Sequence, residues 1–208
     1  MLTKMKLFLD IETLPVAGSQ LDIIKQFYQE IKQKKASSVK DGVDFETYMR
    51  NTSFQGEFGR IFCIGYAVDN EEAKCLSGDE KKILKDFWEL AQNAALFIGH
   101  NIMEFDLRFI YKRSCVWQVQ PSRDLSFARY RNEPIFDTMK EWEKWSSQGT
   151  SLHKLSIALG LSSPKDGGID GSKVYDYYLA GKQDEIIKYC MRDVEATREI
   201  YKKITFSK

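Results

Sequence analysis

The spacing of hydrophobic and polar residues along the chain predicts alternating strands and helices. Five short stretches are expected to be strands: residues 6–13, 60–68, 73–76, 95–98 and 134–137. Asp69 and Asn70 separate the second stretch from the third, which predicts an antiparallel hairpin near the start of the fold. Strands that alternate with helices indicate an α/β fold with a central mixed sheet flanked by helices.

Apolar residues at a helical period predict most of the helices. These helices are expected at residues 21–31, 81–90, 105–112, 139–145, 151–159 and 183–204. The S-x-x-E sequence from Ser77 to Glu80 predicts a capping box, and Gly160 is expected to end the fifth helix. Residues 36–53 are predicted to be a polar excursion. The mixed pattern of residues 114–132 predicts no definite element.

Composition narrows the class of protein. A chain of 208 residues with 43% hydrophobic and 29% charged residues fits one globular domain. Its net charge of +1 lacks the basic excess of a tight nucleic-acid binder, so any nucleic acid would be bound locally. The four cysteines lack a C-x-x-C spacing, and there is no signal-peptide or membrane-spanning pattern. We therefore expect a cytoplasmic protein that does not enter a membrane.

Two acids stand at the end of the first predicted strand, where apolar residues are expected. Because side chains alternate in a strand, Asp10 and Glu12 point to the same face, about 7 Å apart along the backbone. Burial of carboxylates is unfavourable without a compensating cation. The pair therefore indicates half of a metal site.

Two later segments carry acids that could complete it. In the final helix, Tyr189 and Asp193 lie one turn apart on one face, and on this pattern alone a solvated surface pair is an equal alternative. Asp106 begins a predicted helix, where a capping role is the simpler interpretation. Together the four carboxylates form an all-oxygen set that suits two Mg²⁺ or Mn²⁺ ions and two-metal phosphodiester cleavage.

The order of these motifs resembles a known superfamily. D-x-E at Asp10, N-x-x-x-F-D at residues 101–106 and Y-x-x-x-D at Tyr189 resemble the DEDD 3′-5′ exonucleases of the tyrosine-bearing branch. The middle motif is similar to the proofreading exonuclease domain of family-B DNA polymerases and to related stand-alone exonucleases. The resemblance implies a ribonuclease H-like fold and one exonuclease domain over residues 1–208.

The resemblance also implies residue roles. The five catalytic positions would be Asp10, Glu12, Asp106, Tyr189 and Asp193. The four acids would hold the two cations and Tyr189 would orient the attacking water. Asn101 and Phe105 would contact the terminal nucleotides, and Thr13 and Leu14 would pack around the 3′ end.

The implied activity is metal-dependent removal of nucleoside 5′-monophosphates from the 3′ end of single-stranded DNA. Two alternatives stay open on the sequence: RNA as the substrate, and a non-catalytic nucleic-acid-binding module with the same fold. Residues 16–58 form an insertion relative to a minimal core. It either borders the substrate cleft or covers the sheet edge.

Several other residues are expected to be structural. His100 and His153 are interpreted as non-catalytic, and Asp137 as a helix cap. Trp142 and Trp145 are expected in the core rather than on a base-stacking surface. The glycines of residues 166–171 are interpreted as turn residues, since they lack the spacing of a phosphate-binding loop.

Overall fold

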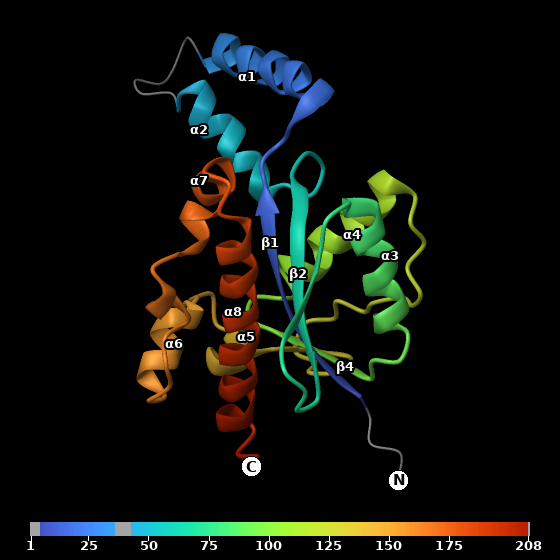
Figure 1. Ribbon diagram of the computed structural model, residues 1–208, viewed down its shortest axis with the longest axis vertical. Helices are drawn as coiled ribbons and strands as arrows, with labels where there is room; N and C mark the ends of the chain where they lie inside the picture. Colours follow the sequence, from blue (N-terminus) through green and yellow to red (C-terminus); the bar gives the residue numbers. More distant parts are fainter. Residues whose placement is uncertain (1–4, 36–42, 208) are drawn as a thin grey trace.

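A five-stranded mixed sheet organises the chain (Figure 1). The computed structural model describes residues 5–35 and 43–207. The strands are β1 Lys6–Leu14, β2 Arg60–Val68, β3 Lys74–Ser77, β4 Leu96–Gly99 and β5 Ile135–Asp137, in the spatial order β3-β2-β1-β4-β5. β1 pairs antiparallel with β2 and parallel with β4, so all five predicted strands and the mixed sheet are confirmed.

Helices cover both faces of this sheet. The α-helices are α1 Leu21–Lys35, α2 Phe45–Arg50, α3 Glu80–Ala91, α4 Asp106–Trp117, α5 Thr138–Trp142, α6 Leu152–Ala158, α7 Val174–Leu179 and α8 Gln183–Ile204. Short 3₁₀ turns lie at Gly18–Gln20, Asn51–Phe54, Pro164–Gly167 and Gly171–Lys173. Within the described ranges, no helix is long and apolar enough to cross a membrane.

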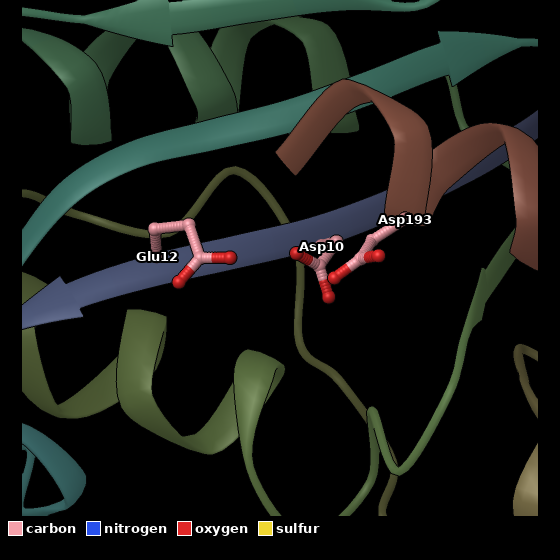
Figure 2. Close-up of side chains that lie close together, drawn as sticks. All are labelled: Asp10, Glu12 and Asp193. Carbon is pink, nitrogen blue, oxygen red and sulfur yellow. The ribbon is translucent and has the colours of Figure 1, made fainter. Parts of the chain in front are cut away.

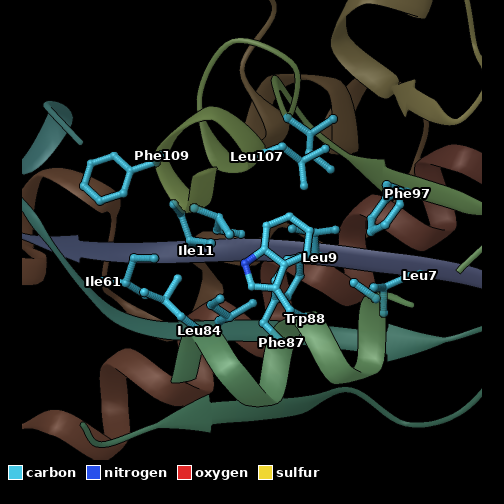
Figure 3. Packing of buried hydrophobic residues seen from close by; sticks show 14 of the residues in the cluster. Leu7, Leu9, Ile11, Ile61, Leu84, Phe87, Trp88, Phe97, Leu107 and Phe109 are labelled. Atoms are coloured by element: carbon cyan, nitrogen blue, oxygen red, sulfur yellow. The ribbon is translucent and has the colours of Figure 1, made fainter. Parts of the chain in front are cut away.

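β1 separates the two halves of the core by its alternating side chains. Leu7, Leu9 and Ile11 face α3 and α4 and belong to the larger buried cluster (Figure 3). Phe8 faces the opposite side and packs against Val194 of α8. Burial of each large apolar side chain contributes roughly 1.5–3 kcal/mol. Asp10 and Glu12 have the parity of Phe8, so the strand presents both acids to α8.

Gly65 explains how α8 comes so close to the acids. It pairs with Asp10 across the sheet. A Cβ at this position would lie 2.8 Å from the Cys190 Sγ and 3.1 Å from the Cys190 carbonyl oxygen. Glycine in a strand often marks such a close approach. The missing side chain therefore allows α8 to pack directly over the residue opposite Asp10.

Three local predictions need correction. The capping box is wrong: Asp79 caps α3 by accepting from the Lys82 N–H, because the Glu80 carboxylate is turned inward to Arg113. The polar excursion contains α2, whose cap is Asp44. The part of this prediction at residues 36–42 lies outside the described residues.

The third correction concerns the tryptophan-rich helix. α5 ends at Trp142, and both Lys144 and Trp145 have positive φ. Trp145 packs against the core as expected, whereas Trp142 is 43% exposed. The Asp137 cap is confirmed, since its carboxylate accepts from the backbone N–H groups of Met139 and Lys140.

Candidate active site

The open edge of β1 receives the start of α4. β4 pairs only with residues 6–8 of β1, so the strand continues past its neighbour. Beyond that point the Ile11 N–H donates to the Asp106 Oδ1 at 3.1 Å. The cap position of α4 belongs to Phe105, without a side-chain bond. The interpretation of Asp106 as a simple cap is therefore wrong, since its carboxylate binds α4 to β1.

Tyr189 and Asp193 lie on the buried face of α8. Their exposed fractions are 7% and 6%, and Cys190 between them is fully buried. Ile187 and Met191, apolar residues of the same helix, are only partly buried. The alternative of a solvated surface pair is therefore wrong.

Three of the predicted acids form one cluster. Asp10, Glu12 and Asp193 each place a carboxylate oxygen within 4.8 Å of the others (Figure 2). In this view the carboxylates of Asp10 and Asp193 are neighbours, and Glu12 lies further along β1. Asp106 is outside this group of three but lines the same pocket. The structure thus brings all four acids to one pocket. The carboxylate oxygens of three of them lie close enough together to hold one ion.

Burial and mutual repulsion raise the pKa values of these carboxyl groups. Burial raises the pKa of Asp193 to about 7. Burial likewise raises the pKa of Asp106 to about 7, against the opposing effect of its backbone hydrogen bonds. Burial first, and the Asp193 charge second, raise the pKa of both Asp10 and Glu12 well above the usual range. Unneutralised charge is therefore unfavourable in this site.

One buried oxygen of this cluster is unsatisfied. Among the described residues, the Asp193 Oδ1 has no hydrogen-bond donor. An unsatisfied buried acceptor costs roughly 1–3 kcal/mol, and more when it is charged. A hard divalent cation would satisfy this oxygen and offset the repulsion among the acids. The donor set therefore fits Mg²⁺ or Mn²⁺ better than a softer metal.

A pocket of about 190 Å³ surrounds the acids. Thr13, Asn101 and Phe105 line it, as do Ser53 and Phe54 from the insertion. The Thr13 Oγ1 donates to the Ser53 carbonyl at 2.7 Å. Of the predicted substrate-contacting residues, Leu14 is the exception: its side chain is buried beside Tyr189 in a separate apolar cluster.

A strained turn presents Asn101 to the pocket. Asn101 has φ +63°, in the left-handed region. The Asp137 carboxylate accepts from the backbone N–H groups of Asn101 and Met103, in addition to capping α5. Asp137 therefore fixes the turn that carries the middle motif.

Sequence reasoning missed several residues of the pocket wall. His100 lines it, with Nδ1 3.0 Å from the Thr138 Oγ1 and Nε2 2.8 Å from the Thr150 carbonyl oxygen. Burial lowers the pKa of His100. Gly171 comes from a segment without a motif, whereas Ser53 and Phe54 lie in the insertion that was one candidate for the border of the cleft, and His100 is adjacent to Asn101.

Comparison with known proteins identifies the family. Predicted 3′-5′ exonucleases related to the exonuclease domain of PolB match residues 55–208, more than half of the chain. The chain belongs to this family of PolB-related exonucleases. The matched range contains Asp106 and Asp193 but begins after β1, so the geometry described above is what connects Asp10 and Glu12 to them.

Two proteins similar to this member of the PolB-related exonuclease family are DNA polymerases. One from Archaeoglobus fulgidus is 23% identical over 158 residues, covering 69% of this chain and 20% of the polymerase. The family B DNA polymerase of Pyrobaculum calidifontis matches 97% of this chain and 24% of its own, with a TM-score of 0.67 and 13% identity. At that identity the likeness shows the fold alone. The chain spans about a fifth to a quarter of the length of these relatives.

Proposed function

We propose that residues 1–208 form one metal-dependent exonuclease domain that hydrolyses phosphodiester bonds at the 3′ end of single-stranded DNA. The products would be nucleoside 5′-monophosphates. The observation that carries this proposal is the buried cluster of Asp10, Glu12 and Asp193 with an unsatisfied oxygen on Asp193. The family match over residues 55–208, which contains Asp193 but not Asp10 or Glu12, supports nuclease chemistry for the chain.

Asp10, Glu12 and Asp193 would hold one divalent cation, and Asp10 with Asp106 a second. When bound, such ions would lower the pKa of the attacking water and stabilise charge on the phosphate and leaving oxygens. Tyr189 has a pKa raised by burial and by the neighbouring Asp193 charge, so it stays a neutral phenol. A neutral hydroxyl in this position would orient the attacking water beside Asp193.

The remaining pocket residues would position the strand end. The Asp137 carboxylate fixes the backbone of Asn101. The ring centroid of Phe105 lies 6.3 Å from that of Phe54, so two aromatic rings stand next to each other in the pocket wall. Aromatic rings stack on bases of any sequence, as exonuclease substrates require. Thr13, at the rim of the acids, would contact the terminal sugar and phosphate, and Leu14 would support Tyr189 from below.

We also propose that the insertion at residues 16–58 borders the bound strand. Phe54 is 64% exposed and lines the acid pocket opposite Phe105. Phe54→Ala should weaken binding of a single-stranded oligonucleotide by about tenfold, since loss of one stacking ring typically has this effect. The control is Phe206→Ala, a ring outside the insertion that is 94% exposed and does not line the pocket. Equal affinities for the two variants would leave the insertion as a cover of the sheet edge.

The reaction is tested by incubating the protein with 5′-labelled single-stranded DNA, duplex DNA and RNA in Mg²⁺, Mn²⁺ or EDTA. A ladder that shortens from the 3′ end of single-stranded DNA, with metal only, is the expected result. Preferential shortening of RNA would reassign the substrate. Metal binding and strand binding without shortening of any substrate would favour the non-catalytic module.

A further inference from the structure

A second, larger pocket lies outside the acid site. It has a volume of about 600 Å³ and is formed by α3, α4 and the irregular segment after α4. It shares no lining residue with the acid pocket. Its volume falls in the range of sites that bind small organic ligands. The segment that closes it is the one for which the sequence pattern predicted no definite element.

Aromatic rings form part of its wall. The pocket is lined by Tyr111 from α4 and Phe127 from the irregular segment, above Trp88 of α3. Tyr111 is 52% exposed, whereas Trp88 is only 2% exposed and serves as a floor. Phe127 packs partly on the core and is covered by the Arg108 guanidinium, whose Cζ is 4.8 Å from the ring centroid. Tyr111 therefore offers the accessible ring of this wall.

Cations concentrate around the same pocket. Arg108, Lys112 and Arg123 line it, against one acid, Asp124. Ion pairs with Glu104 and Glu57 hold Arg108 and Lys112 in place. In the part of the chain that the structure describes, Arg123 makes no ion pair, and its Cζ lies 5.5 Å from the Phe97 ring centroid. Arg123 is therefore the cation of this pocket that could receive an anion, next to the aromatic wall.

We propose that this pocket binds one nucleotide of the single-stranded substrate, upstream of the nucleotides held in the acid pocket. The base would stack on Tyr111 and the phosphate would contact Arg123. α4 links the two pockets: Asp106 is its first residue, and Tyr111 follows about 8 Å further along the helix axis. This inference rests on the proposed exonuclease function for the identity of the strand.

Binding is measured by fluorescence anisotropy of a labelled 12-residue oligothymidylate in EDTA. In EDTA the acid pocket lacks the cations that are proposed to hold the terminal phosphate, so the remaining affinity reports on the second pocket. Tyr111→Ala should weaken binding about tenfold and Arg123→Ala several-fold, while Tyr111→Phe retains the ring and the affinity. The control Lys203→Ala removes an exposed charge from the end of α8 and should leave binding unchanged. Circular dichroism verifies that each variant is folded.

Two outcomes would overturn the proposal. One is equal affinity of Tyr111→Ala, Lys203→Ala and the unmodified protein for the oligonucleotide. The other is binding of free thymidine 5′-monophosphate as tightly as the 12-mer, with the same dependence on Tyr111, which would assign the pocket to a free mononucleotide. If the protein cleaves no substrate but its binding of the 12-mer depends on Tyr111, the proposed exonuclease function is wrong and the proposed nucleotide pocket stands. If the protein cleaves DNA but Tyr111→Ala does not change binding, the exonuclease function stands and the proposed nucleotide pocket is wrong.

Discussion

Two buried carboxylates in this chain have opposite surroundings. Glu80, 9% exposed, receives four donors: the Ile61 N–H, the Nε and Nη2 of Arg113, and the Trp117 Nε1, at 2.6–2.8 Å. Asp193, 6% exposed, has neighbouring acids, and its Oδ1 has no donor among the described residues. Both are equally removed from solvent. They differ in whether the protein itself neutralises them.

This difference separates a structural charge from a functional one. The Glu80–Arg113 pair joins α3, α4 and β2, and each carboxylate oxygen of Glu80 accepts two hydrogen bonds. The Asp193 cluster is left incomplete by the protein, at a cost in stability that a bound cation would recover. Buried ionisable groups with this type of mismatch are typical of functional sites. Variants at the two places should therefore affect different properties.

The largest expected effect is on turnover at the acid cluster. Asp10→Asn should lower the rate of 3′-end shortening by about 1,000-fold, because loss of the proposed shared metal ligand would remove several kcal/mol of transition-state stabilisation. The same variant should be at least as stable as the original protein in EDTA, since one repelling charge is gone. Single-turnover assays and thermal unfolding measure the two properties. A rate within tenfold of the original would contradict the assignment of Asp10.

At the satisfied carboxylate the expectation is reversed. Glu80→Ala should reduce the free energy of unfolding by roughly 3 kcal/mol, because Arg113, 3% exposed, would be left as an unpaired buried charge. Any remaining folded protein should keep its metal affinity. Urea unfolding provides the measurement. The double variant Glu80→Leu with Arg113→Met is the control, since replacing both partners by apolar groups should recover much of the loss.

The comparison also has a pH dependence. The pKa of Asp193 is about 7 in the folded protein and near 3.8 in a free carboxyl group, so between these values the folded chain holds a proton that the unfolded chain has lost. The raised pKa of Asp193 therefore favours the folded state. This contribution to the free energy of unfolding is fully present below about pH 4 and is lost as the pH rises through about 7.

In EDTA, Asp193→Asn should therefore be more stable than the original protein by up to about 4 kcal/mol at pH 8, and the difference should shrink towards pH 5. Mg²⁺ should raise the melting temperature of the original protein and not that of the variant. Because burial lowers the pKa of His100, this residue makes the folded state less stable as the pH falls. The effect is the same in both proteins. If the free energies of unfolding of the two proteins changed in parallel with pH, the raised pKa could not belong to Asp193.

Much of this architecture could be predicted from periodicity. Strand β1 and its two acids were identified because alternation fixes the face of each residue once one face is apolar. The orientation of α8 was not, since Ile187 and Met191 look like core residues. Tertiary packing decides otherwise: Gly65 admits Cys190, and the buried face follows from that contact.

The role of Asp106 needed information that lies elsewhere in the chain. Its bond to the Ile11 N–H exists because β4 ends early and leaves that donor free, which no property of residues 101–106 reveals. The second pocket was missed for a related reason. Its wall is an irregular segment, where Phe127 is held by the core rather than by a local pattern. By contrast, the cap at Asp44 could have been found, since Asp before a helical stretch is a strong local signal.

The smallest expected effect distinguishes the acids from the residue beside them. Tyr189→Phe should lower turnover by on the order of tenfold to a hundredfold, because only the orientation of the attacking water is lost. The ring would still pack against Ile186 and Leu14, so the melting temperature should change little. Metal affinity, measured by calorimetry with Mn²⁺, should also be retained, since the phenol of Tyr189 is not a ligand in the proposed site. A loss of metal affinity equal to that of Asp193→Asn would mean instead that Tyr189 acts by positioning the Asp193 carboxylate.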